Sequence, residues 1–263
     1  MKQYSLSTLL NQKSIQLLFD IFERESKEIC IVGGSIRDAL IGKKSKDFDI
    51  AANVSPNVIL EILSKNNLRY EDYAYKYGSI NAYIDDQKFQ ITTLREDINQ
   101  AGRHTNIILT QDWKKDASRR DFTINSMYLS RDGKIKDFFN SREDLKNKTI
   151  KFITNIEQSV KEDYLRIFRY FRFLGYFEEP NLIENYDEIL LNYCEESFEF
   201  LSNDLIRQEI LKMFNSPFPL NCFINNKNLE KKYWIDLVKK HFSKTNYTIG
   251  LVRCLNKIDL LIN

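Results

Sequence analysis

The stretch that most constrains this chain runs from Ile31 to Ile50 and reads IVGGSIRDALIGKKSKDFDI. A short β-rich run ends at Gly33-Gly34, and residues 35–41 alternate like the first turns of a helix, which Gly42 then stops. Two glycines let the backbone approach a ligand closely, and the free N–H groups of a helix start attract anions. Arg37, one turn inside, can add a bidentate charge to a phosphate. We therefore predict a strand, a glycine turn and a helix around a triphosphate.

Two carboxylates follow in the run DFDIAA, at Asp47 and Asp49. Residues two apart in a strand point to one face, so both carboxylates project together while Phe48 turns into the core. Like charges this close are tolerable when a divalent cation lies between them, and Mg²⁺ prefers carboxylate and phosphate oxygens. Each motif alone fits a polar strand edge or an ordinary turn. Together, at this spacing, they favour a nucleotide site that uses metal ions.

The segment GGSIRDALIG, followed four residues later by DFD, resembles the head motif of the class II nucleotidyltransferases. This family contains the CCA-adding tRNA nucleotidyltransferases and the bacterial poly(A) polymerases. Further motifs follow in the family's order and at its spacings: QITTLRED (90–97), GRH (102–104), RRDFTINSMY (119–128), DGKIKDFFN (132–140) and EDYLRIFRYFRF (162–173). The resemblance covers about residues 28–215, and it is closest to the CCA-adding enzymes of mitochondria and α-proteobacteria.

The resemblance implies an α+β fold: a nucleotidyltransferase head with a small mixed β-sheet and helices, followed by an all-helical neck and a shortened body. We expect the head at 1–139, a neck that recognises the nucleobase at 140–215, and a short helical body at 216–263. The chain is short for the family, so we expect the grip on tRNA to be either minimal or supplied in trans.

The implied reaction is template-independent addition of CMP and AMP, from CTP and ATP, to the 3′ end of tRNA with release of pyrophosphate. Mg²⁺ is the implied cofactor, held by Asp47 and Asp49 as the catalytic pair. Gly33, Gly34, Arg37, Arg119 and Arg120 would surround the triphosphate. A class II poly(A) polymerase shares these motifs and is the first alternative. A catalytically idle RNA-binding module is the second.

The head also contains recognisable secondary-structure signals. An amphipathic helix is expected over 14–25, and a helix capped by Ser55-Pro56 should cover the sheet. Residues 78–84 and 88–94 alternate with period two and predict an antiparallel hairpin joined by residues 85–87. We expect a helix to begin at Asp112 and to continue through residues 122–125.

The polar stretch 95–106 has one glycine and few apolar anchors, which predicts a mobile loop beside the active site. The alternative is a plain connector. In the resembled family a flexible loop here is associated with the switch from CTP to ATP, so Arg95, Asp97 and Arg103 are its candidate residues. Glu96 or Asp97 could also supply a further carboxylate to the metals.

From Glu157 onward the pattern is helical, and we expect one helix from Glu162 to Tyr176. Asp163, Arg166, Arg169 and Arg172 would project from one side of it toward the nucleotide. Asp163 accepts hydrogen bonds and Arg166 donates them, which matches the amino group beside a ring acceptor that cytosine and adenine share. Uracil and guanine would present the reverse pattern.

Composition bounds the remaining possibilities. The 263 residues are 43% hydrophobic and 29% charged, which indicates a soluble protein with a real core. The sequence has no apolar run long enough for a membrane span and no recognisable signal peptide, so we expect a bacterial-type cytoplasmic protein. Location in an organelle matrix is the alternative. Four scattered cysteines favour buried thiols over zinc or disulfides.

The net charge of +2 is nearly neutral, but it is unevenly distributed. From 225 to 263, eight Lys or Arg stand against three acids, a local charge of +5. A solvated helical face is one interpretation; contact with tRNA phosphates is the other. Its candidate residues are Lys231, Lys232, Lys239 and Lys240. The oligomeric state is not predicted.

Overall fold

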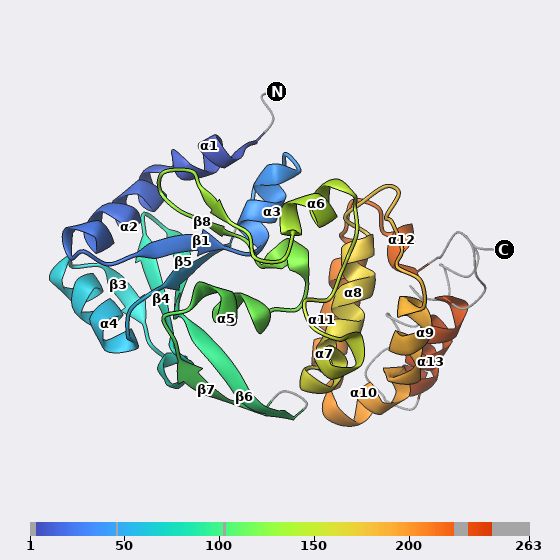
Figure 1. Cartoon of the computed structure of the whole chain (residues 1–263). Coiled ribbons are helices and arrows are strands. Elements are labelled where there is room, and N and C mark those ends of the chain that lie inside the picture. The colour runs from blue at the N-terminus through green and yellow to red at the C-terminus, as the bar shows by residue number, and fades with distance from the viewer. Residues whose placement is uncertain (1–3, 46, 102–103, 224–230, 244–263) are drawn as a thin grey trace. The chain divides into compact units, whose positions relative to one another are not determined.

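The computed structural model describes residues 4–45, 47–101, 104–223 and 231–243 (Figure 1). Backbone contacts divide the chain into two compact units. The first consists of Met1–Ile98 and Asn106–Leu145, and the second of Asn99–Thr105 and Lys146–Asn263. The predicted end of the head at 139 therefore differs slightly from this division, and the boundary at 215 stays a prediction.

A seven-stranded mixed sheet organises the first unit, in the order β3-β4-β5-β2-β1-β8-β9. Only the β2–β5 pairing is parallel; the other described pairs in this sheet are antiparallel. This arrangement confirms the predicted α+β head. The elements are α1 (Leu6–Leu10), α2 (Lys13–Arg24), β1 (Ile29–Val32), α3 (Gly34–Leu40), β2 (Phe48–Ala52), α4 (Pro56–Lys65), β3 (Arg69–Glu71), η1 (Tyr75–Tyr77), β4 (Ser79–Ile84), β5 (Gln87–Thr93), β6 (Arg95–Ala101), β7 (His104–Leu109), α5 (Trp113–Ser118), η2 (Thr123–Asn125), β8 (Tyr128–Leu129), β9 (Ile135–Lys136) and α6 (Ser141–Lys146).

The two faces of the sheet differ because side chains alternate along each strand. On one face, apolar residues such as Phe48, Phe89 and Ile80 are buried, and the Phe48 and Phe89 rings stack at 5.6 Å. Helix α4 contacts β3, β4 and β5 and covers this apolar face, as its sequence pattern predicted. On the opposite face of β5, Lys88 and Gln90 are exposed and Thr92 is partly buried.

The predicted β4–β5 hairpin is confirmed, with one change in its turn. Gln87 pairs with Ile84 as the first residue of β5, so the turn consists of Asp85 and Asp86 alone. Both have positive φ, 47° and 59°, as a two-residue type I′ turn requires. The turn matches the twist of the strands and fixes their register.

The stretch expected to be a mobile loop is instead a two-stranded sheet. Strands β6 and β7 pair with each other, and the tip residues Gly102 and Arg103 lie outside the described residues. The prediction of a loop was wrong because it relied on polarity. A hairpin that packs only partly against a core can form from polar residues, since its backbone groups pair with each other.

The helix that begins at Asp112 also differs from expectation. The Asp112 carboxylate caps α5 and accepts hydrogen bonds from the N–H groups of Lys114 and Lys115. Helix α5 ends at Ser118, and residues 123–125 form the separate 3₁₀ turn η2. The predicted continuation was therefore wrong.

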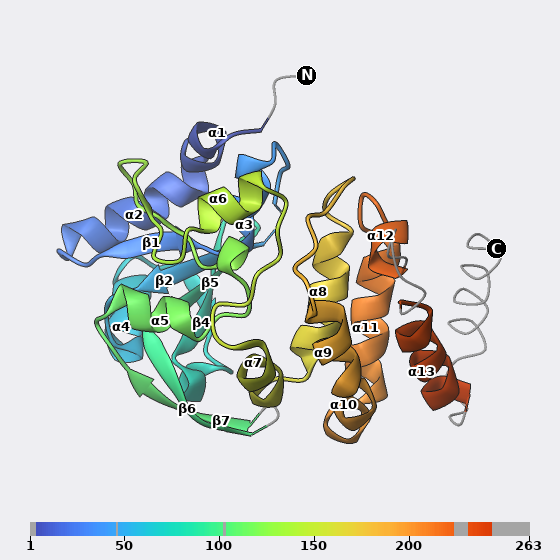
Figure 2. The ribbon, with the colours of Figure 1, turned by 45° about the vertical axis from the view of Figure 1, so that its right-hand side comes forward.

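The second unit is helical, as predicted. Its elements are α7 (Ile156–Glu162), α8 (Leu165–Leu174), α9 (Tyr186–Asn192), α10 (Cys194–Phe200), α11 (Asn203–Phe214), α12 (Leu220–Phe223) and α13 (Lys231–Ser243). Figure 2 shows α8 and α11 side by side, and they are in contact. Helix α8 buries Phe168, Tyr170 and Phe171.

The single helix expected from Glu162 to Tyr176 is broken. Helix α7 ends at Glu162, and Asp163 has an extended backbone with φ −151° and ψ 103°. Its Oδ1 accepts a hydrogen bond at 3.0 Å from the N–H of Leu165, the first residue of α8. An aspartate that bonds the N–H two residues on favours a helix start over a helix interior, which explains the break.

Three of the four cysteines, Cys30, Cys194 and Cys222, are buried free thiols, and Cys254 lies outside the described residues. Burial raises the pKa of both Cys30 and Cys194 to about 12. These thiols are therefore protonated and unreactive at neutral pH, as expected.

Candidate active site

The glycine turn at the end of β1 has a backbone that only glycine adopts readily. Gly33 has φ 78° and ψ −132° and precedes α3. A Cβ built on it would lie 3.7 Å from Arg120 Nη1 and 3.9 Å from Asp49 Oδ2. The turn therefore leaves an open space between a cation and a carboxylate. Gly34 lies close to the Arg37 guanidinium, with 3.3 Å between its Cβ position and Nη2.

Helix α3 ends as the sequence predicts. Gly42 has φ 79°, its N–H donates to the carbonyl of Ala39, and the N–H of Lys43 donates to the carbonyl of Asp38. This pair of bonds is a Schellman motif, which satisfies the last carbonyls of the helix. The chain can then turn back into β2, where the aspartates lie.

Both predicted catalytic aspartates are exposed, and Phe48 between them is buried. Asp49 lies in β2 opposite Val32, the last residue of β1, and Asp47 immediately precedes the strand. The exposure of both aspartates around a buried Phe48 is the pattern that strand alternation predicts. Asp49 lies next to the glycine turn.

Arg37 is buried, with 5% of its surface exposed. Its Nη1 donates to Asn125 Oδ1 at 2.6 Å, and its Nε and Nη2 donate to Asp38 Oδ1 at 3.0 and 2.7 Å. These bonds join α3 to η2. A contact between Arg37 and phosphate stays a prediction.

A buried carboxylate, Asp116, organises the arginines at the end of α5. Its Oδ1 accepts from Arg119 Nε at 3.0 Å and from the Arg95 N–H at 3.1 Å. Its Oδ2 accepts from Tyr128 Oη at 2.6 Å and from Arg120 Nη2 at 3.2 Å. The Asp116 side chain is 1% exposed, so this carboxylate lies inside the protein.

The charges of this cluster decide the ionisation of its members. Burial by itself would raise the pKa of Asp116. Arg120, Arg119 and the Tyr128 hydroxyl lower the pKa by a larger amount, so it falls from 3.8 to about 2. Burial also raises the pKa of Tyr128, so its hydroxyl stays protonated and donates to Asp116. Arg120 is thereby held with Nη1 near the glycine turn and Nη2 on Asp116.

Two residues expected in a loop belong to this cluster. Arg95 Nε lies 3.3 Å from Asp97 Oδ1, and Asp97 Oδ2 lies 3.8 Å from Arg119 Nη1. Arg95 also donates to the carbonyl of Tyr77. Burial is the main cause that lowers the pKa of Arg95. Arg103, the third predicted loop residue, lies outside the described residues.

A residue that sequence reasoning missed lies beside Asp49. In the parallel β2–β5 pairing Asp49 is opposite Gln90, so both side chains leave the same face, and Gln90 is exposed. The strand pairing places the Gln90 side chain on that face, where its Nε2 donates to Ser79 Oγ at 3.1 Å, whereas Glu96 and Asp97 lie in β6. The polar–apolar alternation of β5 was visible in the sequence, but its parallel register with β2 was not.

In the second unit, Arg166 is buried and donates through Nη1 to Ser159 Oγ at 2.6 Å and Glu162 Oε2 at 3.0 Å. The Arg169 guanidinium lies 5.6 Å from the centre of the Phe173 ring. Arg172 Nε lies 2.7 Å from Glu209 Oε2 of α11. Because Glu209 is 2% exposed, this pair joins α8 to α11 inside the unit.

The C-terminal lysines are only partly described. The side chains of Lys231 and Lys232 lie outside the described residues. Lys239 Nζ lies 4.0 Å from Asp236, and its side chain is 15% exposed. Lys240 Nζ lies 3.8 Å from Glu195, and its side chain is 67% exposed. Contact between these lysines and tRNA stays a prediction.

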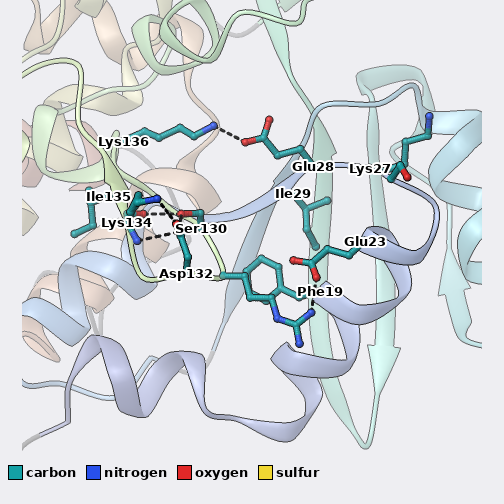
Figure 3. A pocket seen from close by; sticks show the side chains of 12 residues that line it. Phe19, Glu23, Lys27, Glu28, Ile29, Ser130, Asp132, Lys134, Ile135 and Lys136 are labelled. Atoms are coloured by element: carbon teal, nitrogen blue, oxygen red, sulfur yellow. Dashed lines mark hydrogen bonds and ion pairs between the residues drawn. The ribbon is translucent and has the colours of Figure 1, made fainter.

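An open groove of about 980 Å³ lies at the β9 edge of the first unit (Figure 3). Most of the charges that line it are paired. Arg131 bonds Asp20 and Glu23, Lys136 bonds Glu28 at 2.6 Å, and Lys134 bonds Asp132 at 2.7 Å. Paired surface charges of this kind indicate a solvated rim rather than a nucleotide site.

Comparison with known proteins finds a match to most of the first unit. Residues 29–151 match the family model of the poly A polymerase head domain. The resemblance to class II nucleotidyltransferases is thereby confirmed.

Curated relatives that align with part of the chain carry the names of CCA-adding enzymes. The human mitochondrial CCA tRNA nucleotidyltransferase 1 is 43% identical over 183 residues, which cover 66% of this chain and 42% of that protein. A CCA-adding enzyme in complex with ATP is 26% identical, with a TM-score of 0.70 over 98% of this chain and 59% of that one. The Thermotoga maritima CCA-adding enzyme with tRNA is 25% identical, with a TM-score of 0.70 over 98% and 60%.

The chain spans about two fifths of the length of the human relative. Relatives include mitochondrial and bacterial proteins, so the comparisons fix no compartment. In the described part of the chain, no helix is both long and apolar enough to cross a bilayer.

Nucleotidyltransferases with this head domain generally use a divalent metal ion. The described residues contain no cluster of three or more His, Cys, Asp or Glu side chains suited to a metal. A pair of carboxylates, Asp47 and Asp49, remains, with the Gln90 amide beside it. Mg²⁺ commonly takes one or two carboxylates and fills its shell with water and phosphate oxygens, so the residues fit such an ion.

Proposed function

We propose that this chain adds CMP and AMP, from CTP and ATP, to the 3′ end of tRNA and releases pyrophosphate. The observation that carries the proposal is Asp49 beside the Gly33 turn and the held guanidinium of Arg120, with the exposed Asp47 two residues before it. Relatives bear CCA-adding names, and solved relatives are described with ATP and with tRNA. In a bacterial-type cell the compartment would be the cytoplasm.

Asp47 and Asp49 would hold Mg²⁺, which when bound lowers the pKa of the attacking 3′ hydroxyl and neutralises charge on the leaving pyrophosphate. The chain's own groups bind and orient the substrate. Arg120 presents Nη1 to the space at Gly33, so its guanidinium can form a charge-assisted hydrogen bond with a triphosphate oxygen there. Asp116 fixes Arg120 before substrate arrives, which removes the cost of ordering a long side chain.

Choice of the base is proposed to lie with Asp163 and Arg166. The Asp163 carboxylate and the Arg166 guanidinium are three positions apart and carry opposite hydrogen-bonding character. Support comes from their position at the start of α8 and from the cap bond that orders Asp163. Arg169 is proposed to assist. Arg166 is bonded to Ser159 and Glu162, which orient it, and Arg172 is paired with buried Glu209.

The test is incubation of tRNA that lacks its 3′ CCA with each NTP in turn and Mg²⁺. Asp47→Ala and Asp49→Ala should each lower incorporation of CMP and AMP by about 100-fold or more, with tRNA affinity unchanged. Asp86→Asn, an exposed acid in the β4–β5 turn, is the matched control and should keep activity. Incorporation by either alanine variant at more than a few per cent of wild type would reject the metal assignment.

Poly(A) polymerase activity is the second candidate, because the matched head domain bears that family's name. The products separate the two functions. Three added nucleotides in the order C, C, A support CCA addition, and a long run of A supports the polymerase. A chain that binds RNA but turns over no NTP would be an idle binding module.

A further inference from the structure

The face of the sheet that carries Asp49 continues as a row of polar side chains across three further strands. Asp49 pairs with Gln90, Gln90 with Asn81, and Asn81 with Glu71. A parallel row runs from Lys88 through Tyr83 to Arg69. Directly paired residues point to the same side of a sheet, so all seven share one face. We call this set, Asp49, Lys88, Gln90, Asn81, Tyr83, Arg69 and Glu71, the polar face.

None of the seven residues of the polar face is buried in the core, and Asp49, Lys88, Gln90 and Arg69 are exposed. Neighbouring strands lie about 4.8 Å apart, so three spacings place Glu71 roughly 14 Å from Asp49. The polar face therefore starts at the candidate catalytic carboxylates and leads away from them.

An ordered stack stands at the far end of the polar face. The Arg69 guanidinium lies 4.0 Å above the centre of the Tyr83 ring, and the Tyr83 hydroxyl donates to Glu71 Oε2 at 2.6 Å. Glu71 thereby holds Tyr83 in place, and Tyr83 supports Arg69 from below. Because Arg69 is exposed, the other plane of its guanidinium is available, and RNA bases stack on such planes.

A cation lies between this stack and the carboxylates. Lys88 precedes Phe89, which pairs with Phe48, so Lys88 runs alongside Asp47 in the parallel β2–β5 pairing. Its side chain is exposed, and within the described residues it makes no ion pair with an acid. Two lysines of the groove in Figure 3 differ, since Lys134 and Lys136 are neutralised by Asp132 and Glu28.

We propose that the polar face binds the single-stranded 3′ end of the RNA substrate, upstream of the nucleotide that reacts. The Lys88 ammonium contacts a backbone phosphate, and the Arg69 guanidinium, held by Tyr83, stacks on a base. A flexible strand needs both kinds of contact, because phosphate contacts position it and stacking orders its bases. This inference rests on the proposed function and extends it to the acceptor strand.

The experiment measures affinity for tRNA that lacks its 3′ CCA, without nucleotide, over a series of salt concentrations. Lys88→Ala should reduce the slope of log affinity against log salt by about 0.7, the value for one phosphate contact on a single strand. Arg69→Ala should weaken binding about 5- to 100-fold through lost stacking. Arg69→Lys keeps the charge but not the plane, so it should retain the wild-type salt slope and still lose affinity.

Lys27→Ala is the matched control, a partly exposed lysine of the groove at the opposite edge of the sheet, and it should bind RNA as the wild type does. The Michaelis constant for CTP should be unchanged in all four variants. Wild-type RNA affinity and salt slope in both Lys88→Ala and Arg69→Ala would overturn the proposal and leave a solvated or protein-binding face. If these variants lost RNA affinity but the wild-type protein added no nucleotide to tRNA, the proposed function would be rejected and the RNA-binding role of the polar face would stand.

Discussion

Replacing Asp116 with Asn tests whether one buried carboxylate holds the arginines of the candidate active site. The wild-type carboxylate accepts four hydrogen bonds, from the Arg95 backbone and from the side chains of Arg119, Arg120 and Tyr128. Asparagine has nearly the same shape but offers one acceptor oxygen. Its amide N–H₂ would face two donors, and its lack of charge would leave two guanidinium groups without their partner.

The expected loss of stability follows from the pKa and from the burial. A carboxyl pKa of about 2 against 3.8 corresponds to about 2 kcal/mol of stabilisation from ionisation. Donors left without a buried acceptor cost about 1–3 kcal/mol. Breaking a buried ion pair by removing one partner typically costs about 3–5 kcal/mol, so we expect a loss of about 3 kcal/mol at neutral pH.

The pH dependence has a defined sign. Because the pKa of Asp116 is lower in the folded protein, its stabilisation is complete above the unfolded pKa of 3.8 and is lost as pH falls toward about 2. The difference between wild type and Asp116→Asn should therefore shrink over that window. In the variant this contribution to the pH dependence is absent.

The assay is urea unfolding followed by circular dichroism, at neutral pH and at several lower pH values. Glu96→Gln is the control, because it removes the exposed Glu96–Lys115 pair near the same cluster and should cost less than about 1 kcal/mol. If Asp116→Asn unfolded within about 1 kcal/mol of wild type at neutral pH, Asp116 would not organise the arginines as described.

Two further predictions concern the turn and the base. Gly33→Ala should cost about 1–3 kcal/mol of stability from backbone strain, and so should its control, Gly133→Ala, at φ 82° in the β8–β9 turn. Only Gly33→Ala should lose CTP affinity, measured by calorimetry, because its methyl group enters the space near Arg120. Equal CTP affinity in both variants would contradict a triphosphate site at Gly33. Asp163→Asn keeps a side-chain oxygen that can cap α8, but its amide adds N–H donors where the carboxylate only accepts. The variant should therefore lose selectivity against UTP and GTP in single-nucleotide incorporation, and its melting temperature should stay near that of the wild type. Unchanged selectivity would place base recognition elsewhere.

The sequence by itself determined the features whose causes lie within a few residues. Gly33 imposes the turn and Gly42 the end of α3, because their positive φ angles favour glycine. The alternation of Asp47, Phe48 and Asp49 determines which side chains face the core. The turn at Asp85 and Asp86 likewise follows from local conformation, although its length was predicted one residue too long.

Only the tertiary structure decided which distant groups meet. Arg37 bonds Asn125, which is 88 positions away, and Arg172 is paired with Glu209 of another helix. The parallel register that sets Gln90 beside Asp49 depends on how β2 and β5 align. Such partners are chosen by burial: a charge removed from water must find a complementary group nearby, and the folded backbone determines which one is within reach.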